Sequence, residues 1–254
     1  MSRIHFVGAG SGAPDLITVR GKKLLEKADI IVYAGSLVNP CLLDYAKEGC
    51  QIYNSAEMTL EEVLEVLEDG YEKGYEIVRL HTGDPCLYGA IREQMDVLDE
   101  KNIKYDYTPG VSSFCGAASS LNIEYTLPNV SQSVIITRMA GRTPVPEKES
   151  IESFAAHKAT MVVFLSTGLL DELSRRLMEG GYSADTPAAI VYKATWDDEK
   201  TFVCTVGTLA QTAKHNNITK TALMIIGDVV GCQKYDRSKL YDPEFTTEFR
   251  EANK

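Results

Sequence analysis

Short apolar runs alternate with amphipathic stretches along the first half of the chain. Apolar, β-branched runs predict strands, and apolar residues spaced three or four positions apart predict helices. The predicted strands lie at residues 4–7, 30–33, 51–53, 76–80 and 104–108, and the predicted helices at 18–28, 40–45, 59–72, 90–101 and 114–121. This alternation predicts a mostly parallel sheet covered by helices.

The pattern changes near residue 130. Further strands are expected at residues 134–137, 160–165, 188–192, 201–205 and 222–226, and helices at 168–179 and 207–215. Two of these strands follow one another directly, separated by a polar stretch at 196–200, which predicts a hairpin and a mixed sheet. The sequence therefore predicts two α/β domains, residues 1–130 and 131–232, followed by a polar tail at 233–254.

The composition limits which binding partners and which cellular location we expect for this protein. The 254 residues are 44% hydrophobic and 24% charged, with a net charge of −10, which argues against a nucleic-acid surface or an anionic membrane as the main partner. The six cysteines form no C-x-x-C pair, so we expect reduced thiols and no metal site. No apolar run approaches the roughly 20 residues of a membrane-spanning helix, and the first residues lack a signal-peptide core. We therefore expect a cytoplasmic protein.

The loop after the strand at 76–80 is the strongest candidate for a site. Asp84 lies there between Gly83, which permits a tight turn, and Pro85, which fixes φ. Ligands of open α/β sheets bind at the carboxyl ends of the strands, where this loop is expected. The alternative is that Asp84 only caps the following helix.

Three further loops follow predicted strands, at residues 8–15, 109–113 and 164–168. In the first, Gly8, Gly10 and Ala13 match a dinucleotide-binding pattern, but Pro14 delays the helix and the second strand is not followed by an acidic residue. The first loop therefore does not support a nicotinamide site. Backbone amides and hydroxyls in such loops can bind a nucleoside and an amino-acid group without a metal.

Conventional catalytic residues are not evident. No serine lies in a nucleophile elbow, and Cys86, although it is near Asp84, is best interpreted as a packed thiol. The basic segment at 137–146 contains Arg138 and Arg142, which are either solvated or bind the carboxylates of an acidic ligand. These observations favour chemistry that depends on positioning two reactants.

Taken together, these motifs resemble the tetrapyrrole (cobalamin/sirohaem) methylase family over about residues 3–231. The resemblance lies in the segment at 7–18, the Thr82-Gly83-Asp84-Pro85 loop with Tyr88-Gly89, and the segments at 109–113 and 222–227. Within the family, the segments at 33–38, 138–146 and 191–196 are similar to the branch that methylates carbon 11 of precorrin-4 or cobalt-precorrin-4.

The resemblance implies two α/β domains with S-adenosylmethionine in the cleft between them, an anionic tetrapyrrole substrate, and a homodimer. It places ten residues at the cofactor: Pro14, Thr82, Gly83, Asp84, Leu87, Ser112, Ser113, Leu165, Ala194 and Ala222. Arg138, Arg142 and Lys193 are the candidates for the substrate's carboxylates, and Asp84 is expected to position the cofactor. No residue is assigned as a catalytic acid or base, and no metal ligand is expected.

Three other functions compete with this interpretation. A sister enzyme would methylate a different tetrapyrrole carbon, and a protein methylase of the diphthamide type would share the fold without the arginine-containing segment. A third possibility is a module that binds tetrapyrroles without turnover. The sequence also leaves open whether the substrate contains cobalt.

Overall fold

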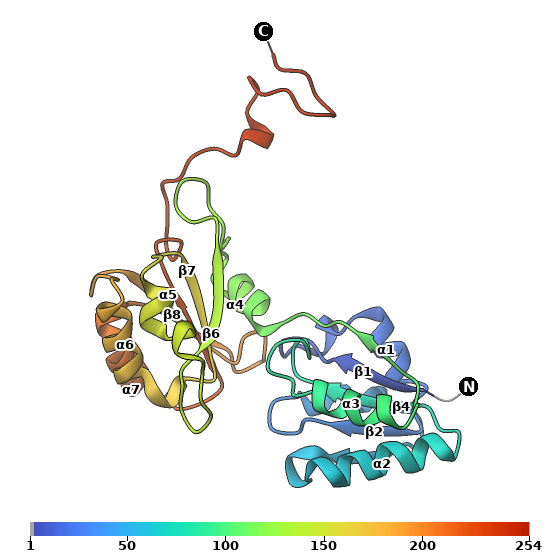
Figure 1. The fold of residues 1–254 in the computed structure, drawn as a ribbon. Coiled ribbons are helices and arrows are strands. Elements are labelled where there is room, and N and C mark those ends of the chain that lie inside the picture. The colour runs from blue at the N-terminus through green and yellow to red at the C-terminus, as the bar shows by residue number, and fades with distance from the viewer. Residues whose placement is uncertain (1–2, 254) are drawn as a thin grey trace. The chain divides into compact units, whose positions relative to one another are not determined.

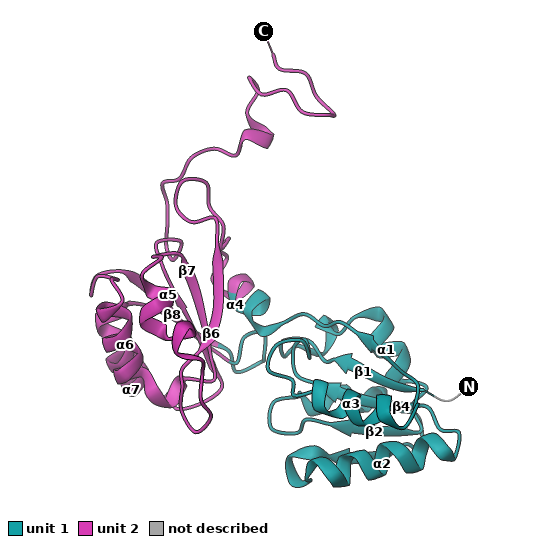
Figure 2. Ribbon diagram, in the orientation of Figure 1, with its two compact units in different colours: residues 1–117, 193–199 teal, residues 118–192, 200–254 magenta. Residues whose placement is uncertain are grey.

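The computed structural model describes residues 3–253, which form two compact units (Figure 2). The first unit comprises the chain up to Ala117 together with Lys193–Glu199, and the second comprises Ala118–Tyr192 and the chain from Lys200 onward. The boundary between the two units therefore lies within helix α4 (Ser113–Leu121). The sequence predicted a domain boundary near residue 130. We call Lys193–Glu199 the returning segment, because it lies in the second half of the chain but packs with the first unit.

The first unit contains a five-stranded parallel sheet. Its strands are β1 (Ile4–Gly8), β2 (Ile30–Tyr33), β3 (Gln51–Asn54), β4 (Ile77–His81) and β5 (Tyr105–Thr108), in the order β3-β2-β4-β1-β5. All residues of β1 and β4 are buried, as expected for central strands covered on both faces. The structure therefore confirms the predicted parallel sheet (Figure 1).

Helices cover both faces of this sheet. On one face, α1 (Val19–Leu25) and the short 3₁₀ helix η2 (Pro40–Tyr45) pack with Val7, Ile31 and Leu80. On the other face, α2 (Leu60–Glu72) and α3 (Arg92–Glu100) pack with alternate strand residues such as Phe6 and Ile77. The two cores thus follow the alternation of side chains along the strands.

The second unit contains a mixed sheet. Its strands are β6 (Val134–Arg138), β7 (Thr160–Phe164), β8 (Pro187–Tyr192), β9 (Lys200–Thr205) and β10 (Ala222–Ile226), in the order β6-β7-β10-β8-β9. Only the β6–β7 pair is parallel, and β8 and β9 form the predicted antiparallel hairpin. Helices α5 (Ile151–Ala155), α6 (Leu170–Glu179) and α7 (Leu209–His215) contribute to one core on this sheet.

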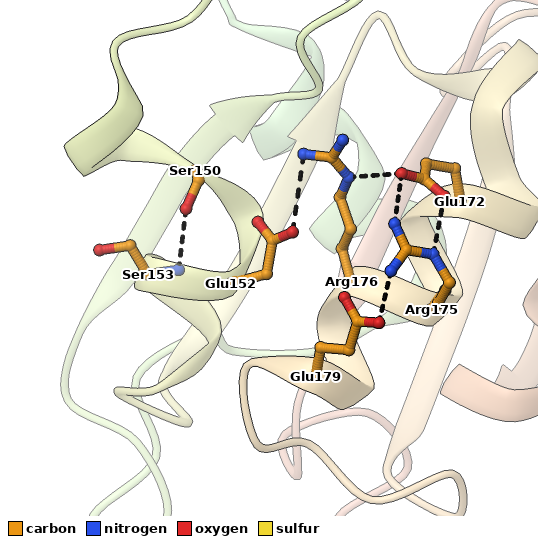
Figure 3. Close-up of polar contacts among 7 residues, drawn as sticks. All are labelled: Ser150, Glu152, Ser153, Glu172, Arg175, Arg176 and Glu179. Carbon is orange, nitrogen blue, oxygen red and sulfur yellow. Dashed lines mark hydrogen bonds and ion pairs between the residues drawn. The ribbon is translucent and has the colours of Figure 1, made fainter.

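Helix α5 was not predicted from the sequence. It is only five residues long, and Ser150 caps it by accepting a hydrogen bond from the Ser153 amide at 3.2 Å. Glu152 on α5 pairs with Arg176 on α6 at 3.6 Å, and Arg176 also donates to Glu172 (Figure 3). Because the helix is so short, we attribute its formation to these contacts and to the burial of Ile151 and Ala155.

The remaining helical elements are short. No helix between residues 3 and 253 has the length and apolar composition needed to cross a membrane. Within residues 233–253, the only helical turn is the 3₁₀ helix Lys239–Tyr241. This tail is not uniformly polar, since Leu240 and Phe249 expose 67% and 95% of their surface.

Candidate functional site

The loops that follow β1, β4 and β5 emerge together from the first sheet. These three strands are neighbours and run parallel, so their carboxyl ends share one edge. Beyond that edge, the Gly10 amide donates to the Gly83 carbonyl at 3.2 Å, and the Gly83 amide donates to the Gly10 carbonyl at 2.9 Å. Two loops far apart in the sequence are thus paired directly through their backbones.

Three glycines make this close approach possible. A Cβ atom on Gly110 would lie 2.1 Å from the Gly83 carbonyl oxygen and 2.8 Å from the Gly8 Cα. A Cβ atom on Gly8 would lie 2.5 Å from the Gly110 nitrogen, and Gly83 has a φ of +59°. All the obstructing atoms belong to the backbone, so a side chain at Gly8 or Gly110 requires the loops to separate.

The carboxylate of Asp84 joins these loops. One oxygen accepts hydrogen bonds from the Cys86 amide at 2.9 Å and from the Tyr107 hydroxyl, and the other accepts from the Gly110 amide at 3.1 Å. Asp84 does not cap the next helix, because α3 begins at Arg92 without a side-chain cap. Its carboxylate instead holds the β4 loop against β5 and the loop that follows β5.

The surroundings of Asp84 favour its ionised form. Burial by itself would raise the pKa of this carboxyl, but the hydrogen bonds from Tyr107 and from the Cys86 and Gly110 amides outweigh it, so the pKa lies below its usual value. Burial and the adjacent Asp84 in turn raise the pKa of the Tyr107 hydroxyl. At neutral pH, Asp84 is therefore a carboxylate committed to three donors, which supports a positioning role. Tyr107 was not predicted as a site residue, because its only signal in the sequence is its place in a predicted strand beside the loop.

Two polar groups at the end of β4 are buried without a hydrogen-bond partner among residues 3–253. They are the Thr82 hydroxyl and the Nε2 atom of His81. An unpaired buried hydroxyl carries a desolvation penalty, which a ligand that hydrogen-bonds to it removes. Thr82 belongs to the predicted cofactor set, so the orphaned hydroxyl fits a bound ligand at this loop.

His81 makes the stability of the first unit sensitive to acid. Burial, together with the nearby Arg79 guanidinium, lowers its pKa to about 3. Between this value and the unfolded pKa near 6.5, the unfolded chain binds a proton that the folded chain does not, so stability falls as the pH falls. We expect His81→Phe to reduce the slope of unfolding free energy against pH by about 1.4 kcal/mol per pH unit between pH 6 and 4. Urea denaturation across this range measures the slope, and an unchanged slope would contradict the prediction.

The other predicted cofactor residues of the first unit lie in the same set of loops. Pro14 begins a 3₁₀ turn in the first loop, and the Leu87 amide donates to the Asp84 carbonyl at 3.2 Å. Ser112 is buried beside Gly83, and Ser113 begins α4. The structure thus brings together Pro14, Thr82, Gly83, Asp84, Leu87, Ser112 and Ser113, with Ala194 in the returning segment, which packs on the first loop.

A second group of predicted residues shares one edge of the second sheet. Because β10 runs antiparallel to β7, the start of β10 at Ala222 lies beside the end of β7. The Thr167 hydroxyl donates to the Ala222 carbonyl at 3.2 Å, and the Met139 amide donates to the Ser166 hydroxyl at 2.9 Å. Leu165 has a φ of 51° and is 63% exposed, an unusual combination for a leucine. Strained backbone of this kind concentrates at ligand sites.

The three predicted substrate-binding side chains differ in their surroundings. The Arg138 guanidinium donates to the Met139, Thr143 and Pro144 carbonyls at 3.2, 3.3 and 2.8 Å, so it holds its own loop together. Lys193 pairs with Asp198 at 2.7 Å and lies over the Trp196 ring at 5.2 Å. Arg142 is exposed and makes no hydrogen bond or ion pair with residues 3–253.

Comparison with known proteins identifies the class. The family of tetrapyrrole (corrin/porphyrin) methylases matches residues 3–210, and the chain belongs to this family. It is 50% identical over 252 residues to the cobalt-precorrin-4 C(11)-methyltransferase of Methanocaldococcus jannaschii, a match that covers 99% of this chain and 97% of that protein. It is 40% identical to the precorrin-4 C(11)-methyltransferase of Pseudomonas aeruginosa, covering 95% and 96% of the two chains.

The fold agrees with these sequence relatives. The crystal structure of the cobalt-precorrin-4 methyltransferase CbiF superposes with a TM-score of 0.88 at 43% identity, covering 90% of this chain and 95% of that one. The predicted membership of the tetrapyrrole methylases and the predicted α/β fold are therefore confirmed.

Proposed function

We propose that this protein is an S-adenosylmethionine-dependent methyltransferase that methylates carbon 11 of precorrin-4, or of its cobalt complex, during corrin-ring synthesis. The main support is the near-complete alignment with relatives named for this reaction, at up to 50% identity. Support from the site comes from the close packing of the predicted cofactor residues of the first unit.

The residues at the edge of the first sheet suit the cofactor. They offer an unpaired buried hydroxyl at Thr82, glycine-rich loops that pack backbone against backbone, and a carboxylate at Asp84 that fixes the loops. S-adenosylmethionine supplies an already activated methyl sulfonium. The protein therefore needs mainly to align two bound reactants, which can lower a barrier by roughly 7 to 11 kcal/mol.

The substrate proposal depends on cationic side chains. Arg142 offers an uncommitted guanidinium, while Arg138 shapes the segment that presents it. The relative of highest identity cited above is named for the cobalt form, so cobalt-precorrin-4 is the first substrate to test. A homodimer in the cytoplasm is part of the same proposal, supported by the family resemblance, and sedimentation analysis measures the oligomeric state.

The test is incubation with cobalt-precorrin-4 and S-adenosylmethionine carrying a ¹³C-labelled methyl group. We expect S-adenosylhomocysteine as a product and a single new ¹³C methyl resonance correlated with carbon 11. Label at a different ring carbon would identify a sister enzyme. Tetrapyrrole binding without S-adenosylhomocysteine formation would identify a non-catalytic binding module.

Arg142→Ala should weaken the substrate interaction selectively. Loss of one charge-assisted hydrogen bond, about 1.5 to 3 kcal/mol, predicts a rise of roughly 10- to 100-fold in the tetrapyrrole KM. The affinity for S-adenosylhomocysteine should stay within about twofold of wild type. Arg175→Ala removes the same charge from the exposed face of α6 and serves as the control. Equal losses of substrate and cofactor affinity in Arg142→Ala would contradict the proposed role.

A further inference from the structure

The returning segment is hydrogen-bonded to the first glycine loop through one side chain. The Thr195 hydroxyl oxygen accepts from the Ala13 amide at 3.1 Å and shares a hydrogen bond with the Ser11 hydroxyl at 3.0 Å. The Thr195 amide donates to the carboxylate of Glu199, within the same segment. One threonine hydroxyl thus connects two points of the loop to a segment more than 180 residues away in sequence.

Small residues create the space that the returning segment occupies. A Cβ atom on Gly12 would lie 2.1 Å from the Trp196 Cδ1, and one on Gly116 would lie 3.2 Å from the Thr195 Cγ2 and 2.7 Å from the Ser11 Cβ. The Gly12 carbonyl also accepts from the Asn39 side chain at 2.9 Å. The loop is therefore confined on several sides, and Thr195 supplies the hydrogen bonds on the side of the returning segment.

The backbone at Thr195 is strained. Its φ of 69° lies in the left-handed region, which β-branched residues rarely adopt, and Lys193 is also left-handed at 47°. Glycine would adopt this conformation without a steric penalty. A threonine at such a position indicates that its side chain contributes something glycine cannot, and the hydroxyl bridge to Ser11 and Ala13 is that contribution.

We propose that Thr195 is a positioning residue for the cofactor: its hydroxyl fixes residues 11–13, and so sets the position of Pro14 and of the loop edge that faces the ligand. The inference extends the proposed function, because it assumes that the first loop binds S-adenosylmethionine. Thr195 itself need not touch the ligand. Its effect is transmitted through Ser11 and the Ala13 amide, whose positions follow the threonine oxygen.

The test compares three variants by calorimetric titration with S-adenosylhomocysteine. Thr195→Val keeps the shape and the β-branch but lacks the hydroxyl, and should raise Kd at least tenfold. Thr195→Ser keeps the hydroxyl and should stay within about threefold of wild type. Thr195→Gly relieves the strain but also lacks the hydroxyl, so it should bind as weakly as Thr195→Val while its melting temperature stays close to wild type. A merely structural role predicts instead that affinity follows melting temperature.

The possible outcomes separate the two proposals. If the wild type binds and Thr195→Val binds equally well, the positioning role is overturned and the methyltransferase proposal stands. If the wild type itself does not bind, the proposed function is overturned, and the positioning role with it. Ser11→Ala provides a second route should Thr195→Val not fold: it removes one of the two bonds to Thr195 and should raise Kd about threefold, whereas an unchanged Kd would count against the role.

Discussion

Replacing Asp84 with alanine should reduce the affinity for S-adenosylhomocysteine at least 100-fold. The substitution removes the acceptor for two backbone amides and the Tyr107 hydroxyl, which together hold three parts of the chain in one arrangement. Each donor left unpaired costs about 1 to 3 kcal/mol, and a factor of 100 in binding corresponds to only about 2.7 kcal/mol. The measurement is calorimetric titration of wild type and variant, with S-adenosylhomocysteine as the ligand.

Two further variants measure how much of the lost affinity is due to individual hydrogen bonds of Asp84. Tyr107→Phe removes one of the three donors and should weaken binding about 5- to 10-fold, and Asp84→Asn, which keeps one carbonyl acceptor, should fall between Tyr107→Phe and Asp84→Ala. Wild-type affinity in Asp84→Ala would show that the carboxylate does not organise the site.

The pH dependence of binding follows from the same carboxylate. Because the pKa of Asp84 in the folded protein lies below its ordinary value near 4, the side chain is ionised from about pH 5 upward and accepts its three hydrogen bonds there. Titration of Asp84 should therefore cause no change in the affinity for S-adenosylhomocysteine between pH 5 and 8.

Gly110→Ala should lower the free energy of unfolding by about 3 to 5 kcal/mol, a large share of the 5 to 15 kcal/mol typical of a folded protein. The new methyl group would meet the Gly83 carbonyl oxygen at 2.1 Å, and neither backbone can move without breaking the Asp84 contacts. Chemical denaturation monitored by circular dichroism measures the loss.

Gly168→Ala is the control for this experiment, since a Cβ at Gly168 meets no atom within 4 Å and the residue has no positive φ. It should change stability by less than about 0.5 kcal/mol. Equal stability of the two variants would show that the loops have more freedom to separate than their packing indicates.

The hydrophobic pattern predicted the elements well where burial governs them. Strands β1, β2, β4 and β10 are fully or almost fully buried, so apolar side chains mark them in the sequence. Helix α5 escaped prediction because it has five residues and depends on Arg176, which comes from a different helix. Contacts with other elements stabilise this helix, and the hydrophobic pattern of its own residues gives no information about those contacts.

The part of the site formed by the loops after neighbouring parallel strands could be predicted from the sequence. Glycine and proline marked the loops after β1, β4 and β5, and parallel pairing explains why they meet. The roles of Tyr107 and Thr195 depend instead on contacts with distant residues, 23 and more than 180 positions away. Nothing local to either residue distinguishes it from an ordinary strand or turn residue.

The returning segment also bears on the order in which the protein matures during synthesis. Residues up to Ala117 contain every strand of the first sheet, so this sheet can assemble while the ribosome is still translating the second unit. Its first glycine loop cannot obtain the Thr195 hydrogen bonds before Glu199 has been added to the chain, when about four-fifths of the 254 residues have been made. A nascent chain therefore completes this part of its ligand site late, and a fragment ending at Ala117 would retain the sheet without that loop's final restraint.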